Sequence, residues 1–168
     1  TSQDLDSPLH ANQWLLDAQG NVRAARTSQG QLSALHWRDP ASGKWRKLRE
    51  FDRFTGHDVS LLAVMPDGKL LVSARPGRNT DALYVYDPAT DKLADAPLLG
   101  LQQYDVRPTA LLHHQGKLLG VRLVTDAEVT HWFDTGMKAH QAAVDQLLPN
   151  TANLITPPRR GSSPWLLV

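Results

Sequence analysis

The segment Pro66-Asp67-Gly68-Lys69-Leu70-Leu71-Val72 places a turn glycine between two apolar runs, with Leu61–Val64 on its N-terminal side. An Asp-Gly pair flanked by such runs is typical of a β-hairpin. The same turn glycine recurs at Gly20 and Gly116, so the spacing is 48 residues on each side (68 − 20 and 116 − 68). A fixed period between about 20 and 50 residues indicates a repeat architecture.

Each repeat also contains an aspartate that ends a run of β-branched or aromatic residues. Asp39, Asp87 and Asp134 follow the turn glycines at offsets of 19, 19 and 18 residues (39 − 20, 87 − 68 and 134 − 116). We expect the aspartate to accept backbone hydrogen bonds, while Pro40 and Pro88 preset φ for a tight turn. A last short strand, around 44–48 and 92–93, then completes four strands in about 48 residues, which is typical of a β-propeller blade.

The fold expected from this repeat is all-β, a partial β-propeller of about three and a half four-stranded blades. The blades cover roughly 9–54, 58–100 and 105–149, and an incomplete unit covers 150–168, in which Trp165–Val168 aligns with Lys69–Val72. A closed ring of seven or eight such blades needs roughly 330 to 390 residues. We therefore expect this chain to be a partial propeller domain, about half of such a ring, and a piece of a larger protein.

One short helix is expected near 138–148. Five apolar residues lie on one helical stripe, and Pro149-Asn150 ends the pattern. These are Ala139, Ala143, Val144, Leu147 and Leu148. The favoured interpretation is an insertion that covers its own sheet at the propeller rim, and the alternative is a docking helix for a partner.

Composition excludes several classes of function. The chain has 168 residues with 18 basic and 17 acidic side chains, so its net charge of +1 provides no field that attracts nucleic acid or an anionic membrane. It has no cysteine, which excludes disulfides, thiolate metal sites and cysteine nucleophiles but fits both a bacterial periplasm and a cytoplasm. Because Thr1 is not an initiator methionine, we expect that processing, cloning or proteolysis made this start.

No catalytic, cofactor or metal site is expected. Neither Ser28 nor Ser163 lies in the Gly-x-Ser-x-Gly elbow of an α/β-hydrolase. The neighbours His113 and His114 point to opposite faces of a strand, and His36 and His131 are interpreted as structural. A basic strip with interleaved apolar residues, Lys44-Trp45-Arg46-Lys47-Leu48-Arg49, resembles a binding surface for single-stranded nucleic acid, but a protected outer edge strand explains it better.

Two aspartates are the only candidate site residues. Asp58 and Asp105 lie 47 residues apart (105 − 58), each followed by a valine and each just before an inner hairpin. The innermost strand of a propeller blade lines the central channel, so these carboxylates could face it. The favoured alternative is that each one caps a loop.

The order of these motifs resembles the N-terminal propeller of bacterial prolyl-oligopeptidase-family serine peptidases. The residues that carry the resemblance are Trp14-Leu15-Leu16-Asp17, Gly20, Val22-Arg23, Asp67–Val72, Gly77-Arg78, Leu83–Asp87, Val144-Asp145 and Leu148-Pro149. In that family an α/β-hydrolase domain with a Ser-Asp-His triad follows the propeller, and the propeller restricts access to the active site. The triad has no counterpart in this chain.

The resemblance implies a non-catalytic propeller fragment that gates peptide substrates to a hydrolase domain of the same polypeptide. The alternative is a TolB-like propeller that serves as a scaffold for protein contacts. A partial ring leaves sheet faces and edges uncovered, so we also expect self-association through those surfaces.

Overall fold

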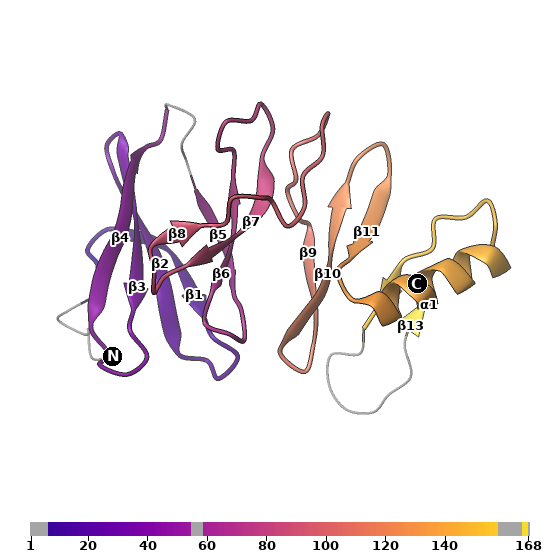
Figure 1. Ribbon diagram of the computed structural model, residues 1–168, viewed down its shortest axis with the longest axis horizontal. Helices are drawn as coiled ribbons and strands as arrows, with labels where there is room; N and C mark the ends of the chain where they lie inside the picture. The colour runs from indigo at the N-terminus through magenta and orange to yellow at the C-terminus, as the bar shows by residue number, and fades with distance from the viewer. Residues whose placement is uncertain (1–6, 55–58, 158–165, 168) are drawn as a thin grey trace. The chain divides into compact units, whose positions relative to one another are not determined.

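The computed structural model describes residues 7–54, 59–157 and 166–167. It consists mostly of antiparallel β-sheet with one helix, which confirms the predicted β-rich class (Figure 1). The chain divides into two compact units, Thr1–Val106 and Arg107–Val168. All the described sheets are open.

The first unit contains two four-stranded antiparallel sheets, each with its strands in chain order. The first sheet consists of β1 (Ala11–Leu16), β2 (Val22–Gln29), β3 (Leu32–Arg38) and β4 (Trp45–Asp52). The second sheet consists of β5 (Ser60–Val64), β6 (Leu70–Ala74), β7 (Ala82–Asp87) and β8 (Lys92–Leu93). Both sheets match the four strands predicted for a repeat.

The turns show that Gly20 and Gly68 are equivalent positions and that Gly116 lies in a different kind of turn. Gly20 and Gly68 have φ of 84° and 82°, and each donates a backbone hydrogen bond three residues back, to Asp17 (3.0 Å) and Met65 (2.9 Å). Gly116 has φ of 79°, but Gln115 also has a positive φ of 49°, so this hairpin turns with two residues instead. Positive φ at both central residues is the requirement of a type I′ turn.

The two sheets of the first unit pack face to face over one hydrophobic core. Leu35, Trp37 and Phe51 of the first sheet contact a cluster that includes Val72 and Tyr84 of the second. At about 25 cal/mol for each Å² of buried apolar area, a core of this kind is the main stabilising contribution to such a unit.

Two hydrogen bonds link the sheets, and one of them joins corresponding positions of the two repeats. Gln13 Nε2 on β1 donates to the Leu61 carbonyl on β5 at 2.7 Å, a contact between residues 48 apart. Arg46 on β4 donates to the Pro88 carbonyl in the next Asp-Pro turn. The first strand of one repeat therefore lies beside the first strand of the next.

The second unit departs from the four-stranded pattern. Its sheet has three strands, β9 (Ala110–His114), β10 (Lys117–Val124) and β11 (Glu128–Trp132), in the order β11-β10-β9. The expectation of a fourth strand is wrong here, because helix α1 (Thr135–Leu147) follows β11 directly. Beyond the helix, β12 (Ile155–Thr156) pairs with β13 (Leu166–Leu167), so the described part of the final segment forms the expected antiparallel pair.

The predicted helix is present, but the predicted packing stripe is largely wrong. Asp134 caps the helix by accepting the Met137 N–H at 3.1 Å, so the helix begins three residues before the predicted start. Met137, in this first turn, is the buried anchor, and Val144 is the one member of the predicted stripe that packs on the core. Leu147 is 80% exposed and Leu148 is 44% exposed. The first turn of α1 packs on its own sheet, where Met137 shares a core cluster with Trp132 and Leu119. Most of the remaining helix is exposed, so whether α1 covers the sheet or docks a partner stays a prediction.

Candidate functional site

The two predicted site residues have different outcomes. Asp58 lies outside the described residues. Asp105 is half-buried, and its carboxylate accepts a hydrogen bond from the Asp81 backbone N–H at 2.8 Å. The next residue, Val106, donates its own N–H to the Asp81 carbonyl at 2.9 Å. Asp105 therefore anchors the start of β7, as expected of a loop-capping carboxylate, and its role in a channel stays a prediction.

An ion pair extends this anchor. The Asp81 carboxylate pairs with Arg75 Nε at 2.8 Å across the loop between β6 and β7. Arg75 and Asp81 are 37% and 17% exposed, so the pair is partly accessible to water. Such a pair fixes the loop geometry, but it offers no nucleophile and no basic group held ready for proton transfer.

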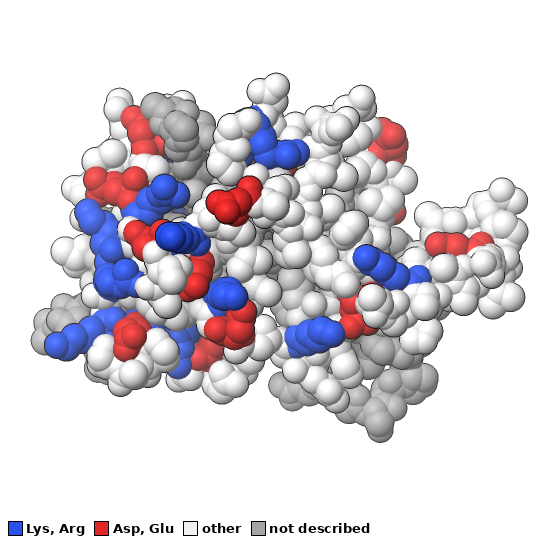
Figure 2. Space-filling model, in the orientation of Figure 1, with Lys and Arg blue, Asp and Glu red and all other residues white. Residues whose placement is uncertain are grey.

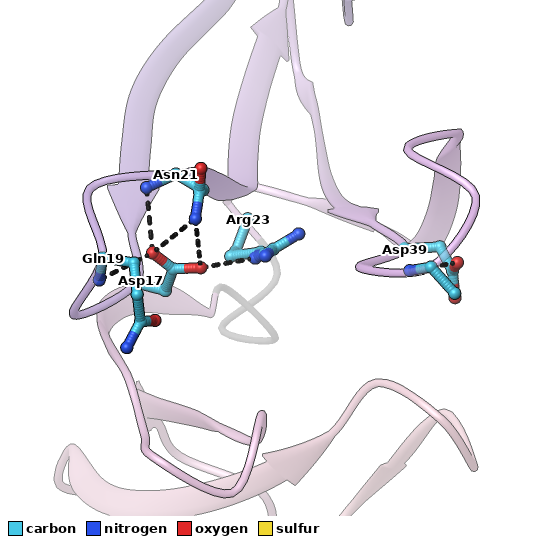
Figure 3. A network of polar contacts seen from close by, with 6 residues as sticks. Asp17, Gln19, Asn21, Arg23 and Asp39 are labelled. Carbon is cyan, nitrogen blue, oxygen red and sulfur yellow. Dashed lines mark hydrogen bonds and ion pairs between the residues drawn. The ribbon is translucent and has the colours of Figure 1, made fainter.

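A denser polar network lies at the turn between β1 and β2 of the first sheet, as Figure 3 shows. The Asp17 carboxylate accepts hydrogen bonds from Asn21 N (2.8 Å), Gln19 N (3.0 Å) and Arg23 Nε (2.7 Å). Burial by itself raises the pKa of Asp17, but these hydrogen bonds together outweigh it and lower the pKa to about 2. An aspartate held as a fully bonded anion stabilises its turn and is unsuited to act as a general base near neutral pH.

Asp39 in the same view has the role that the sequence predicted for it. Its Oδ1 accepts the backbone N–H groups of Ala41 (3.0 Å) and Ser42 (2.7 Å). The hydrogen bonds from Ser42 come first among the causes that lower the pKa of Asp39. Asp87 accepts the Ala89 N–H at 2.8 Å in the next repeat, and this bond likewise lowers its pKa.

His36, His131 and Ser28 make structural contacts. His36 Nε2 lies 3.1 Å from Thr27 Oγ1, and His131 stacks edge-on against Phe133 at 5.4 Å between ring centroids. Burial comes first among the causes that lower the pKa of His36 and of His131. Ser28 Oγ accepts from Asn12 at 2.9 Å, and Ser163 lies outside the described residues. Within the described part of the chain, no three His, Asp or Glu side chains are grouped to hold a metal ion.

A groove of about 810 Å³ in the first unit is lined by charges that balance. The lining includes three basic and three acidic side chains, which are Arg49, Lys69, Lys92, Asp87, Asp91 and Asp95. Beside it, the hydroxyl of buried Tyr86 donates to the Asp91 carboxylate. Burial and then this hydrogen bond raise the pKa of Tyr86, so the phenol stays neutral. The groove therefore has no net field that selects an anion or a cation.

A smaller cavity of about 320 Å³ lies in the second unit, at the first turn of α1. His114, Lys117, Asp134 and His140 line it with Met137. The Asp134 carboxylate there accepts from Lys117 Nζ at 2.8 Å, in addition to capping the helix. The hydrogen bond from Lys117 and then that from the Met137 N–H lower the pKa of Asp134. The Asp134 carboxylate therefore stabilises the start of α1.

The basic strip was predicted to form an edge strand, and the structure confirms this. It forms β4, which lies at the end of the strand order in the first sheet. Figure 2 shows basic side chains over this region interspersed with acidic ones. Lys47 pairs with Glu50 at 2.9 Å, and Arg46 is bound to the Pro88 carbonyl. Acidic side chains interrupt the strip, so it lacks the continuous positive charge that a nucleic-acid backbone requires.

Sequence reasoning missed the contacts that join residues distant in the chain. The Gln13–Leu61 hydrogen bond and the Trp14–Trp45 ring contact have no local motif. The 48-residue period was the one available signal, since it brings Gln13 and Leu61 to equivalent positions of successive repeats.

No described helix is long and apolar enough to cross a membrane. No protein-family model, no curated protein and no solved structure matches the chain.

Proposed function

We propose that this chain is a non-catalytic part of a β-propeller that gates access of peptide substrates to an α/β-hydrolase domain of the same polypeptide. The observation that carries the propeller part is the stacking of the first and second sheets. Each is a four-stranded antiparallel sheet in chain order, and the two bury one shared core. Blades of a propeller are stacked in this way around an axis.

The equivalence of positions across the two sheets supports blades over an ordinary sandwich. The Gln13–Leu61 hydrogen bond joins residues one full repeat apart, on the first strands of the two sheets. The Arg46–Pro88 bond joins the last strand of the first sheet to the second Asp-Pro turn. First strands that lie beside each other in successive sheets extend into a ring when more repeats are added.

The gating role is inferred from the resemblance in motif order, which is an analogy at the level of the fold. The described carboxylates that carry lowered pKa values are bonded within turns or, for Asp134, at the cap of α1, as expected of a scaffold. The catalytic serine, aspartate and histidine would then belong to the hydrolase domain.

The natural coding sequence tests the proposal most directly. We expect it to continue past Val168 with further repeats of about 48 residues and then a Gly-x-Ser-x-Gly motif. Removing the propeller from that longer protein should relax its discrimination between short and long peptides while the serine nucleophile stays reactive. The 168-residue chain should hydrolyse neither peptides nor esters.

Two results would overturn the hydrolase assignment. One is a coding sequence that ends at this point, or that continues for several hundred residues without the motif. The other is hydrolysis by the purified 168-residue chain itself. Closure of the ring with no hydrolase domain would favour the TolB-like scaffold instead.

A further inference from the structure

The third sheet has an open edge at the place where the first and second sheets have a fourth strand. β4 pairs with β3 along its whole length, from Leu32 to Arg38. β8 pairs with β7, and beyond β8 the Leu83 N–H donates to the Leu99 carbonyl at 2.8 Å. β11 is the last strand in the order β11-β10-β9, and no described strand pairs with its outer side. The third repeat therefore lacks the strand that completes the other two.

Alternate residues of β11 direct their backbone groups to this edge. The Phe133 N–H donates to the Leu119 carbonyl at 2.8 Å, in register with the pairing of β10 and β11. Every second residue of an antiparallel pair exchanges hydrogen bonds with its partner, so the odd-numbered residues of β11 bond to β10. The Arg122 carbonyl, opposite Thr130, instead accepts from Thr109 beside β9 at 2.8 Å. The N–H and C=O groups of the even-numbered residues of β11 therefore point outward.

Helix α1 packs on a face of the third sheet and leaves this edge accessible in the described part of the chain. Met137 and Val144 share a core cluster with residues of β9, β10 and β11, so the helix contacts the sheet across all three strands. Three of the five residues of β11 are exposed, and Val129 is 40% exposed, whereas the third strands β3 and β7 are mostly buried. Neighbouring blades of a propeller cover the faces of a sheet, so closure of the proposed ring would leave the outer edge open.

β11 also lacks the features that usually protect an edge strand. Basic side chains, a β-bulge or a very short strand hinder pairing with another chain. The edge strand β4 has Arg46, Lys47 and Arg49, and β8 has only two residues. The pairings that involve β1, β4, β5 and β9 each contain a bulge or irregularity. β11 has five residues, no lysine or arginine, and a regular register with β10.

The geometry points to a binding site for an extended peptide segment of a partner protein, which adds to β11 as an antiparallel fourth strand. A row of backbone donors and acceptors is matched by the backbone of another extended segment, and this mode of recognition is β-strand addition. The first and second repeats supply such a strand from the chain itself, and the third repeat leaves its place open. This inference needs the third sheet alone, so it stands or falls independently of the proposed hydrolase domain.

The side chains of β11 favour a partner strand that combines basic and apolar residues. In the second repeat the strand at this place is Lys92-Leu93, and β4 in the first repeat likewise has Leu48 among basic residues. β11 offers the complement, because Val129 is an exposed apolar side chain and Glu128 beside it is exposed. Glu128 has no ion pair within the described residues, so its charge is available to a basic partner.

Backbone amide exchange measured by NMR tests the site directly. The probe is a synthetic peptide with the sequence of residues 44–52, which contains the fourth strand of the first sheet. In the free chain the N–H groups of Thr130 and Trp132 should exchange rapidly, while those of Val129 and His131 are protected by β10. Saturating peptide should slow exchange at Thr130 and Trp132 by at least about tenfold, because their N–H groups become hydrogen-bonded.

Thr130→Pro separates backbone pairing from other contacts. Proline removes the outward N–H and its ring blocks the edge, and an edge strand tolerates it because β10 does not use that N–H. The peptide Kd, measured by fluorescence anisotropy, should rise at least about tenfold. Thr130→Val is the matched control, since it also lacks the hydroxyl but keeps the N–H, and it should leave the Kd within about twofold. Glu128→Lys should raise the Kd about two- to fivefold at low salt.

Slow exchange at Thr130 and Trp132 in the free chain overturns the inference, because the edge is then already occupied. Protection that grows with protein concentration shows that the occupant is a second copy and overturns it as well. So does a peptide that fails to bind, or that binds Thr130→Pro as tightly as the wild type. An unchanged Kd in Glu128→Lys overturns the choice of a basic strand. The exchange measurement uses the unaltered chain, so it decides the question even if Thr130→Pro does not fold.

Discussion

The second and third repeats begin alike and end differently. Both have a glycine hairpin, and both run into a strand that ends at an aspartate, Asp87 or Asp134. In the second repeat the chain turns into strand β8, and in the third it enters helix α1. Both aspartates accept a nearby backbone N–H, so the aspartate itself does not decide between strand and helix.

The residue four positions after the aspartate accounts for the difference. It is Asp91 in the second repeat, with φ of 56°, and Gly43 at the same place in the first repeat, with φ of 70°. A residue in this left-handed conformation reverses the chain after one turn. The third repeat has Lys138 there, followed by the good helix formers Ala139 and Gln141, and the first turn continues as a helix.

A second difference lies inside the sheets. Val72 pairs with Tyr84 on β6 and β7, and Gly120 pairs with Trp132 at the same place in the third sheet. A Cβ on Gly120 would lie 2.7 Å from the His131 carbonyl oxygen and 2.8 Å from Trp132 Cε3. The larger ring of the third repeat is therefore accommodated by the loss of the opposing side chain.

The largest expected effect comes from exchanging this pair. Gly120→Val should destabilise the second unit by about 1 to 3 kcal/mol, because the new side chain overlaps Trp132 and the backbone of β11. Adding Trp132→Tyr reproduces the second repeat and should recover part of the loss. Urea unfolding of the single and double variants measures this, and a double variant no more stable than the single one would contradict the equivalence of the two pairs.

A smaller effect is expected at the end of the repeat. Lys138→Gly should destabilise α1 by about 1 kcal/mol, because glycine is a poor helix former and supplies the residue that turns the chain elsewhere. The loss of helical ellipticity in circular dichroism checks this. Lys92→Gly, directly after the turn in the second repeat, is the control and should leave the helical signal unchanged. Full helicity in Lys138→Gly would show that another position decides the difference.

The smallest expected effect concerns the two aspartates. Both pKa values are lowered in the folded chain, so each carboxylate adds stability above its unfolded pKa of about 3.9, and this is lost as the pH falls through the lowered value. The Lys117 hydrogen bond is the largest cause at Asp134, and the Ala89 N–H is the largest at Asp87. Lys117→Gln should therefore raise the pKa of Asp134 and leave that of Asp87 unchanged.

Carboxyl NMR titration of both residues in one sample distinguishes the two causes. High salt should imitate Lys117→Gln, because Lys117 is 67% exposed and its charge is screened. Equal responses of Asp87 and Asp134 to the substitution would show that the two sites do not differ as described.

Local chemistry in the sequence determined the repeat, its hairpins and its turns. Glycine supplies positive φ at low cost, aspartate bonds to the backbone beside it, and β-branched or aromatic runs favour strands. These effects act within a few residues, so Gly20, Gly68, Asp39 and the edge strand β4 were predictable from their neighbours. The helix was also predictable, except that its buried anchor is Met137, outside the predicted stripe.

Only the tertiary structure decided which faces pack and which distant side chains meet. Trp14 reaches Trp45 across two intervening strands, and Gln13 bonds to the next repeat, through contacts that depend on sheet register and on the partner face. The same holds for Gly120, whose missing side chain is explained by Trp132 on the neighbouring strand. Register and packing are set by the sum of many weak contacts over the whole sheet, and no single stretch of sequence contains that sum.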